Sequence, residues 1–295
     1  MYQEYFGLRE LPFSLTPDTY FFLNSETHQQ ALEMLQVALQ NREGFLKVTG
    51  EVGTGKTLIC RKLLNELGDD FITAYIPNPN VSAETLYCLL AEELGASSDL
   101  FDACLAPEGT TDRQVLALRE INEYLLNFAD DGYQVVLVID EAQSMPRDTL
   151  EALRLLTNLE TESDKLLQVV LFGQPELDEM LNGRDLRQLL QRITFSYRLN
   201  PFTRADIERY IAHRMILSGY QGGPLFEAQA VSHLVKASRG IPRLVNVLCH
   251  KALMLCYGQG DSMVRRKHMQ AAIKDTESAR TPGLFGWRGW RGLFA

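Results

Sequence analysis

The sequence has few of the features that mark a secreted, metal-stapled or membrane-spanning protein. Only five cysteines occur in 295 residues. None forms a Cys-x-x-Cys pair, which argues against a zinc site or a disulfide framework and predicts reduced thiols in a cytosolic protein. No run of about eighteen uninterrupted apolar residues occurs, so no membrane-spanning helix is predicted. The first ten residues contain acidic side chains and no apolar core, so no signal peptide is predicted there.

Positive charge is also scarce. The chain has 29 Lys and Arg against 38 Asp and Glu, a formal net charge of −9. Binding to nucleic acid through the overall field of a protein needs an excess of clustered Lys and Arg. We therefore expect no general affinity for DNA through the overall field of the protein, and a local basic patch is the alternative. The composition is otherwise that of a globular protein, with 45% hydrophobic residues, and the chain is long enough to form a core without disulfides or structural metals.

The first two thirds of the chain alternate between two hydrophobic patterns. Short apolar runs predict buried strands at residues 45–49, 71–76, 134–139, 166–172 and 193–199. Segments with apolar residues at helical spacing lie before and between them, at residues 25–39, 56–67, 82–94, 113–128 and 149–159. Strands that alternate with helices predict an α/β fold with a mostly parallel sheet, covered by helices on both faces.

The pattern changes after Pro201, where strand signals stop. Thr203 and Asp206 form a capping signature for a helix that runs to about Leu217, and further helices are predicted at residues 226–237, 242–257 and 265–274. We therefore divide the chain into four parts: an aromatic strap at 1–24, an α/β core at 25–201, a small helical domain at 202–278, and a tail rich in Gly, Trp and Arg at 279–295.

A glycine-rich motif follows the first predicted strand and opens a helix. It fits Gly-x-x-x-x-Gly-Lys-Ser/Thr in full, and it predicts that phosphate is bound by residues Gly50, Glu51, Val52, Gly53, Thr54, Gly55, Lys56, Thr57 and Leu58. Backbone N–H groups of such a loop face phosphate oxygens, and the start of the helix adds its positive dipole end. Lys56 is expected to reach the β- and γ-phosphates, and Thr57 to bind Mg²⁺.

An acidic pair ends the most apolar strand. The carboxyl ends of parallel strands open onto the ligand crevice, so Asp140 and Glu141 are expected to lie beside the phosphate loop. Asp140 would then support Mg²⁺ and Glu141 would polarise the attacking water. An acidic helix cap is the alternative interpretation. Together with the loop, the pair predicts hydrolysis of the nucleotide rather than binding alone.

Four further residues are candidates for sensing the γ-phosphate or supplying positive charge in the transition state. Gln174 follows the fourth strand, so its amide could lie beside the attacking water. Arg187 and Arg192 precede the fifth strand, and either could reach into a neighbouring subunit's site. Arg243 opens a helix of the second domain, where it could contact nucleotide. A turn residue before Pro175 and solvated surface arginines are the alternatives.

Several longer motifs accompany these residues. They are Met1-Tyr2-x-x-Tyr5-Phe6-Gly7-Leu8, Pro12-Phe13-Ser14-Leu15-Thr16-Pro17-Asp18, Ile139-Asp140-Glu141-Ala142-Gln143, Phe172-Gly173-Gln174-Pro175-Glu176-Leu177 and Gly240-Ile241-Pro242-Arg243. With the phosphate loop they resemble an AAA+ ATPase. More narrowly, the chain resembles the ExeA/GspA-type secretion ATPases, and among them those of mannose-sensitive haemagglutinin (MSHA) pilus biogenesis. The resemblance covers about residues 1 to 275.

The resemblance implies an AAA+ P-loop NTPase core with a five-stranded parallel sheet of order 5-1-4-3-2 and a helical lid. It implies ATP and Mg²⁺ as ligands, with the nucleotide between core and lid at a subunit interface of a homo-oligomer, such as a hexameric ring. The strap from Phe6 to Pro12 would lie near the adenine. The implied function is ATP hydrolysis that assists assembly of a type IV pilus or a secretion apparatus, in the cytoplasm or peripherally on the bacterial inner membrane.

ExeA-like proteins continue into a membrane-spanning helix and a peptidoglycan-binding domain, and this sequence ends at Ala295 without either. We therefore expect an inner-membrane assembly protein to supply the membrane link. The tail is a second candidate contact, because it places Trp287 and Trp290 beside Arg288 and Arg291, and such side chains settle at lipid interfaces. A disordered end is the alternative.

Two other functions are compatible with the same motifs. One is an ATP-dependent DNA-binding switch like the transposition regulators, against which the acidic net charge counts. The other is a structural adaptor with negligible turnover.

Overall fold

The computed structural model describes residues 2–16, 18–96, 113–157, 159 and 165–279. The chain divides into two compact units. The sheet unit comprises Asn24–Val52 and Lys56–Asn200, and the helical unit comprises Met1–Leu23, Gly53–Gly55 and Pro201–Ala295. Each unit is described by itself below.

The sheet unit contains five strands. They are β1 (Phe45–Thr49), β2 (Phe71–Ile76), β3 (Gln134–Ile139), β4 (Leu167–Gly173) and β5 (Phe195–Arg198). All neighbouring strands are parallel, in the order β2-β3-β4-β1-β5. The predicted α/β class and the order 5-1-4-3-2 are therefore confirmed. The order places the ends of β1, β3 and β4 close together, since β4 pairs with both of the others.

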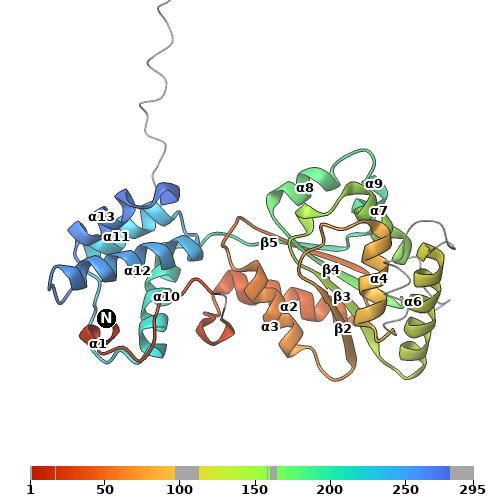
Figure 1. Cartoon of the computed structure of the whole chain (residues 1–295), viewed down its shortest axis with the longest axis horizontal. Helices are drawn as coiled ribbons and strands as arrows, with labels where there is room; N and C mark the ends of the chain where they lie inside the picture. Colours follow the sequence, from red (N-terminus) through yellow and green to blue (C-terminus); the bar gives the residue numbers. More distant parts are fainter. Residues whose placement is uncertain (1, 17, 97–112, 158, 160–164, 280–295) are drawn as a thin grey trace, which may run out of the picture. The chain divides into compact units, whose positions relative to one another are not determined.

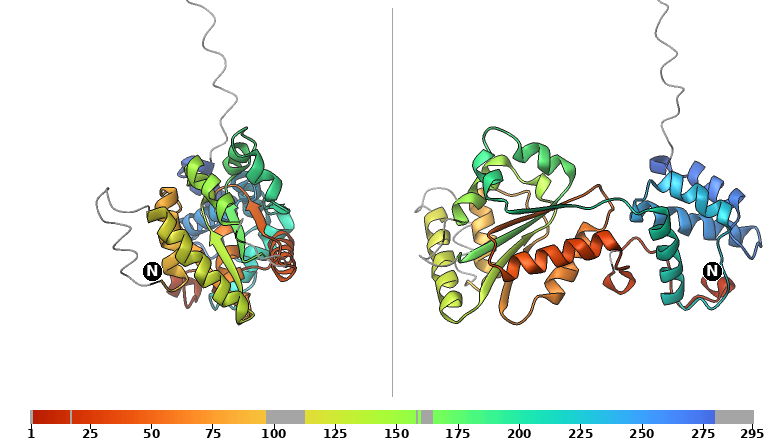
Figure 2. Two further views of the ribbon diagram at one scale, coloured as in Figure 1. Left: turned by 90° about the vertical axis from the view of Figure 1, so that its right-hand side faces the viewer. Right: turned by 180° about the vertical axis from the view of Figure 1, so that it is seen from behind.

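Helices cover both faces of this sheet (Figures 1 and 2). One face is covered by α2 (Glu26–Gln40) and α3 (Lys56–Glu66), and the other by α4 (Ala83–Glu93), α6 (Arg113–Asp130) and α7 (Arg147–Leu156). Two short helices follow β4, namely α8 (Pro175–Leu181) and α9 (Arg187–Arg192). The central strands β3 and β4 are buried almost throughout, which explains their continuous apolar sequences.

The helical unit contains α10 (Arg204–Leu217), α11 (Ala228–Ser238), α12 (Pro242–Gly258) and α13 (Arg266–Lys274), followed by the 3-10 turn η3 (Glu277–Ala279). Thr203 and Asp206 cap α10 reciprocally, as predicted. The N-terminal segment belongs to the same unit, because Tyr2, Phe6 and Phe13 are part of its hydrophobic core. In this unit the described part of the chain is mainly helical.

Several details differ from the sequence predictions, among them the fifth strand, which was predicted at residues 193–199 and spans Phe195–Arg198. The N-terminal segment is not wholly irregular, since it contains α1 (Tyr2–Phe6) and the 3-10 turn η1 (Thr19–Phe21). Helix α7 begins at Arg147 rather than Thr149, directly after Pro146, whose fixed φ suits the position before a helix. Cys88 is disulfide-bonded, so the prediction of reduced thiols is wrong for this residue, since pairing cannot be deduced from spacing. Cys60, Cys249 and Cys256 are free and buried.

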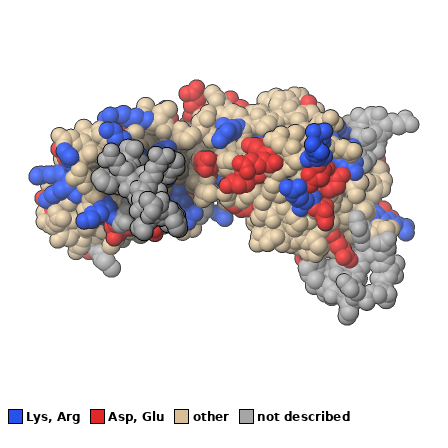
Figure 3. Space-filling view, turned by 90° about the horizontal axis from the view of Figure 1, so that it is seen from above, with Lys and Arg blue, Asp and Glu red and all other residues tan. Residues whose placement is uncertain are grey.

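Charge is unevenly distributed over the surface. In the view of Figure 3, Lys and Arg gather over the helical unit, whereas patches of both signs lie over the sheet unit. Among the described residues no helix is long and apolar enough to cross a membrane. Within those same residues, no cluster of three or more His, Cys, Asp or Glu has the arrangement of a metal site.

Candidate nucleotide-binding site

The phosphate loop connects the end of β1 to the start of α3. Its glycines are needed for the backbone path, because Gly53 and Gly55 have φ values of +82° and +102°, a region that residues with a Cβ atom rarely adopt. Gly50 N–H donates to the carbonyl oxygen of Gly173 at 3.2 Å, so the loop begins at the end of β4. Helix α3 starts at Lys56, and its first N–H groups therefore lie within the motif.

Lys56 is the first residue of α3 and is only 5% exposed. Its Nζ donates to the carbonyl oxygens of Gly50 at 2.8 Å and Glu51 at 3.1 Å. Burial lowers the pKa of Lys56, and the nearby carboxylates of Glu141 and Asp140 oppose this shift. A buried ammonium group that donates to two carbonyl oxygens can gain from a phosphate oxygen, because a hydrogen bond between two charged groups is stronger than one to a neutral acceptor.

Thr57 and Asp140 meet across the junction of α3 and β3. Thr57 Oγ1 donates to Oδ2 of Asp140 at 2.7 Å, and the backbone N–H of Glu141 donates to Oδ1 of Asp140 at 2.9 Å. Asp140 is 3% exposed, and burial raises its pKa, which these two hydrogen bonds oppose. One hydroxyl and one carboxylate at hydrogen-bond distance are oxygen donors of the kind that Mg²⁺ takes from a protein, beside phosphate and water. These residues therefore fit Mg²⁺.

Glu141 has an unusual backbone conformation and a carboxylate held by two amides. Its φ and ψ are +52° and +36°, which is uncommon for a residue other than glycine. Its Oε2 accepts hydrogen bonds from Nε2 of Gln143 at 2.6 Å and Nε2 of Gln174 at 3.0 Å. The residue expected to act as base and the residue expected to sense phosphate are thus in direct contact.

Gln143 had no predicted role, although it lies two residues after Glu141. In addition to its contact with Glu141, its Oε1 accepts the backbone N–H of Gln174 at 2.9 Å. Its position next to the acidic pair was the only sequence signal, because hydrogen bonds of this kind depend on where β4 ends.

The arginine candidates lie elsewhere in the fold. Arg187 is exposed at the start of α9. Arg192, at the end of α9, donates from Nη1 to Oγ1 of Thr157 at 2.7 Å and to the carbonyl oxygen of Arg154 at 3.2 Å. Arg192 thus secures the end of α7 in its own chain, whereas Arg187 faces solvent.

Arg243 is the second residue of α12. It belongs to the helical unit, as does Gly53, and within that unit the backbone N–H of Arg243 donates to the carbonyl oxygen of Gly53 at 3.2 Å. The predicted phosphate-binding residue and the predicted lid arginine are therefore neighbours through their backbones.

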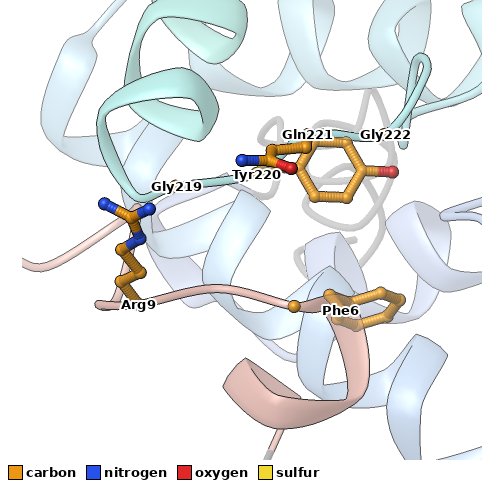
Figure 4. Close-up of a pocket in the computed structure, with 7 residues that line it drawn as sticks. Phe6, Arg9, Gly219, Tyr220, Gln221 and Gly222 are labelled. Carbon is orange, nitrogen blue, oxygen red and sulfur yellow. The ribbon is translucent and has the colours of Figure 1, made fainter.

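The helical unit also contains a surface pocket (Figure 4). It is lined by Phe6, Gly7 and Arg9 of the N-terminal segment and by residues 219–222 after α10. Phe6 and Arg9 come from the strap that was expected near the adenine, but no residue of the phosphate-binding motif lines this pocket. The pocket is therefore not evidence for that expectation.

Comparisons with known proteins identify relatives of this arrangement. Residues 39–181 match the AAA domain family. The chain is similar to general secretion pathway protein A of Aeromonas hydrophila, with 38% identity over 307 residues that cover 99% of this chain and 54% of that protein. The chain thus spans about half the length of this curated relative.

Two solved structures share the fold. The Aeropyrum pernix ORC2 protein in ADPNP–ADP complexes has a TM-score of 0.58 at 15% identity, over 90% of this chain and 73% of that one. The Thermotoga maritima RuvB Holliday junction branch migration motor has a TM-score of 0.52 at 15% identity, over 90% and 73%. At this identity the likeness concerns the fold alone, which is that of the AAA+ P-loop NTPases.

Proposed function

We propose that this chain, whose residues 39–181 match the AAA domain family and which is related to general secretion pathway protein A, is a Mg²⁺-dependent ATPase. The observation that carries the proposal is the convergence of Lys56, Thr57, Asp140 and Glu141 at one edge of the sheet. A phosphate loop alone would support binding. The carboxylate pair beside it supports hydrolysis.

The proposed reaction transfers the γ-phosphoryl group of ATP to water. A water oxygen attacks the γ-phosphorus, the bond to the β,γ-bridging oxygen breaks, and ADP and inorganic phosphate are released. Glu141 would orient the water and accept its proton, and Gln174, which contacts Glu141 at 3.0 Å, would align the same water or the γ-phosphate. Lys56 would stabilise negative charge on the phosphates.

Thr57 and Asp140 are the residues that would hold Mg²⁺. When bound, the ion would neutralise phosphate charge during transfer. Asp140 must be ionised for this role, and its buried position at 3% exposure means that the ionised form is disfavoured until a cation compensates it. The site is therefore expected to prefer nucleotide together with the metal over either alone.

In the cell, the proposed role is to assist assembly of a type IV pilus of the MSHA kind, or of a secretion apparatus, at the bacterial inner membrane. The support is the 38% identity to a general secretion pathway protein along nearly the whole chain. The protein would act as a homo-oligomer. Arg187 of one subunit would reach into the nucleotide site of its neighbour and stabilise charge in the transition state, as an arginine finger does. An ATP-dependent DNA-binding switch is not favoured, since the relative matched along 99% of this chain is a secretion protein.

The cellular role is tested by affinity purification from a bacterial membrane fraction in the presence of ATP, read by mass spectrometry. Wild type, Lys56→Ala and a chain lacking residues 283–295 are compared. We expect an inner-membrane assembly protein with wild type, and its loss with Lys56→Ala. Recovery of only DNA-transaction proteins would contradict the assigned role.

A further inference from the structure

The side chain of Gln143 connects two functional residues, Glu141 and Gln174. Its Nε2 donates to Oε2 of Glu141 at 2.6 Å, while its Oε1 accepts the backbone N–H of Gln174 at 2.9 Å. The donor and acceptor ends of one amide are thus both used. This fixes which end faces which partner, because a flipped amide would point an oxygen at a carboxylate and an NH₂ group at an N–H.

The carboxylate of Glu141 needs such support. Its backbone has φ +52°, and residues in that region stay there only when their surroundings hold them. Part of the hold comes from Ser144, whose Oγ donates to the Glu141 carbonyl oxygen at 2.8 Å. The side-chain amides of Gln143 and Gln174 hold the carboxylate of Glu141, since both donate to its Oε2.

The two amides are not equivalent. Gln174 is proposed to align the attacking water or the γ-phosphate, and turning its side chain toward either would cost Glu141 one donor. Gln143 bonds to the backbone of Gln174, not to its side chain, so that contact is unaffected by such a rotation. Gln143 can therefore keep Glu141 in place while Gln174 engages the substrate.

We propose that Gln143 is a positioning residue that aims the Glu141 carboxylate at the attacking water and ties it to the end of β4. This inference rests on the proposed ATPase function. It predicts that Gln143 affects the chemical step and leaves the grip on phosphate unchanged, because Lys56 and Thr57 make their contacts without it.

Gln143→Glu tests this most sharply. The substitution is nearly isosteric and keeps an acceptor for the Gln174 N–H, but it replaces the donor to Glu141 with a repelling carboxylate. We expect kcat for ATP to fall at least about tenfold, since small misplacements of a catalytic group cost up to about 100-fold, with KM nearly unchanged. Gln29→Glu, an exposed change on α2, is the matched control. Gln143→Met serves if the Glu variant does not fold.

The same change is then made in Glu141→Gln, where an effect through Glu141 can no longer be exerted. We expect no further loss of residual turnover in the double variant. An unchanged kcat in Gln143→Glu, a change in KM alone, or an additive loss in the double variant would each overturn the inference while leaving the ATPase proposal standing. A wild type without turnover would overturn both.

Helices α11 and α13 form a separate surface in the helical unit. The two helices run side by side in the same direction. At their first ends, the carboxylate of Glu227, before α11, accepts the backbone N–H of Arg266 in α13. Midway, the side chains of His233 and Gln270 lie 3.4 Å apart. At their far ends, Arg239, after α11, donates to the carbonyl oxygen of Ser278, beyond α13.

This helix pair carries exposed cations along its length. Lys236 lies one helical turn after His233, and Lys274 one turn after Gln270, so both lie on the same side of the helix pair as the His233–Gln270 contact. Other exposed cations of the pair are Arg239, Arg266 and Lys267. Residues 201–279 contain eleven Lys or Arg against six Asp or Glu, in a chain whose net charge is −9. Figure 3 shows this concentration of Lys and Arg over the helical unit.

We also infer that this basic face, defined by Lys236, Arg239, Arg266, Lys267 and Lys274, binds an anionic lipid bilayer. The five side chains are exposed, and their positive charge complements an anionic headgroup layer. A flat anionic surface contacts one face only, so the acidic remainder of the chain does not oppose binding.

The test is co-sedimentation of the full chain with vesicles of phosphatidylcholine alone or with 30% phosphatidylglycerol. We expect binding to the anionic vesicles only, weakened at least about tenfold in Lys236→Glu/Lys274→Glu, because each basic residue near such a surface contributes about fivefold. Lys62→Glu/Arg119→Glu, in the sheet unit, is the control. Equal binding by both double variants, or tighter binding to duplex DNA than to vesicles at physiological salt, would overturn the inference.

Discussion

The hydroxyl of Thr57 lies 2.7 Å from the carboxylate of Asp140, although 83 residues separate the two in the sequence. The sheet order explains the contact, because β4 pairs with both β1 and β3 and so brings the loop after β1 to the edge where β3 ends. The phosphate loop that contains Thr57 would by itself support only binding, and the acidic pair that contains Asp140 could by itself be a helix cap. Their contact makes one site with oxygen donors suited to Mg²⁺.

The buried Asp140 should make stability depend on pH in a defined direction. Burial raises its pKa above the ordinary value of 3.8. A group whose pKa is raised by folding stabilises the protein below its unfolded pKa, and this contribution is lost as pH rises through the folded pKa. In urea unfolding without metal or nucleotide, Asp140→Asn should therefore gain stability relative to wild type as pH rises from about 4 to about 7. A constant difference across this range would contradict the burial of an ionisable carboxylate.

The buried Lys47 should depend strongly on its partner. Lys47 on β1 forms an ion pair with Asp178 of α8, and its side chain is 8% exposed. Asp178→Ala would leave a buried cation without its partner, and we expect a loss of about 3 kcal/mol in the free energy of unfolding, at the low end for a broken buried pair since Asp178 is partly exposed. The control is Glu66→Ala, which breaks the more exposed Lys62–Glu66 pair and should cost less than about 1 kcal/mol. Equal losses measured by urea unfolding would argue against a structural role for Lys47.

The two candidate arginines should behave differently. Arg187 is exposed, whereas Arg192 is bonded to Thr157 in its own chain. We expect Arg187→Ala to bind ATP normally and to hydrolyse it at least about 100-fold more slowly, since a finger contributes about 10³–10⁵ in kcat. Arg192→Ala should chiefly lower the melting temperature.

Mixing experiments separate a finger that acts between subunits from one that acts within its own. Arg187→Ala and Lys56→Ala chains are each inactive under the proposal, but a mixture contains interfaces with an intact loop on one side and an intact arginine on the other. Phosphate release should therefore reappear on mixing. If the mixture releases phosphate no faster than either variant alone, Arg187 does not act as a finger between subunits.

The sequence was sufficient to predict the layout of the sheet unit. The strands at residues 45–49, 71–76 and 134–139 were predicted with the bounds observed, because strands of a parallel sheet that is covered on both faces have continuous apolar sequences. Helix α7 was predicted at residues 149–159 and spans Arg147–Leu156, since apolar spacing alone does not fix where a helix begins and ends. The sheet order came from resemblance to a known family, not from the pattern of residues.

The site was only partly predictable for a physical reason. Glycines, Lys56, Thr57 and the Asp140–Glu141 pair have fixed spacings, so each could be found from local sequence. The role of Gln143 depends on a hydrogen bond to Gln174 across 31 residues, and the anchoring of Arg192 depends on Thr157 across 35. Such contacts are set by the packing of β4, α7 and α9, for which short sequence patterns carry no signal.

The central claim is that Glu141 acts in hydrolysis and not in binding, and Glu141→Gln tests it most directly. ATP affinity in the presence of Mg²⁺ is measured by calorimetry, and single-turnover phosphate release is measured in the same preparation. We expect Glu141→Gln to bind ATP within about threefold of the wild-type affinity and to release phosphate at least about 100-fold more slowly. Phosphate release at the wild-type rate would contradict the claim.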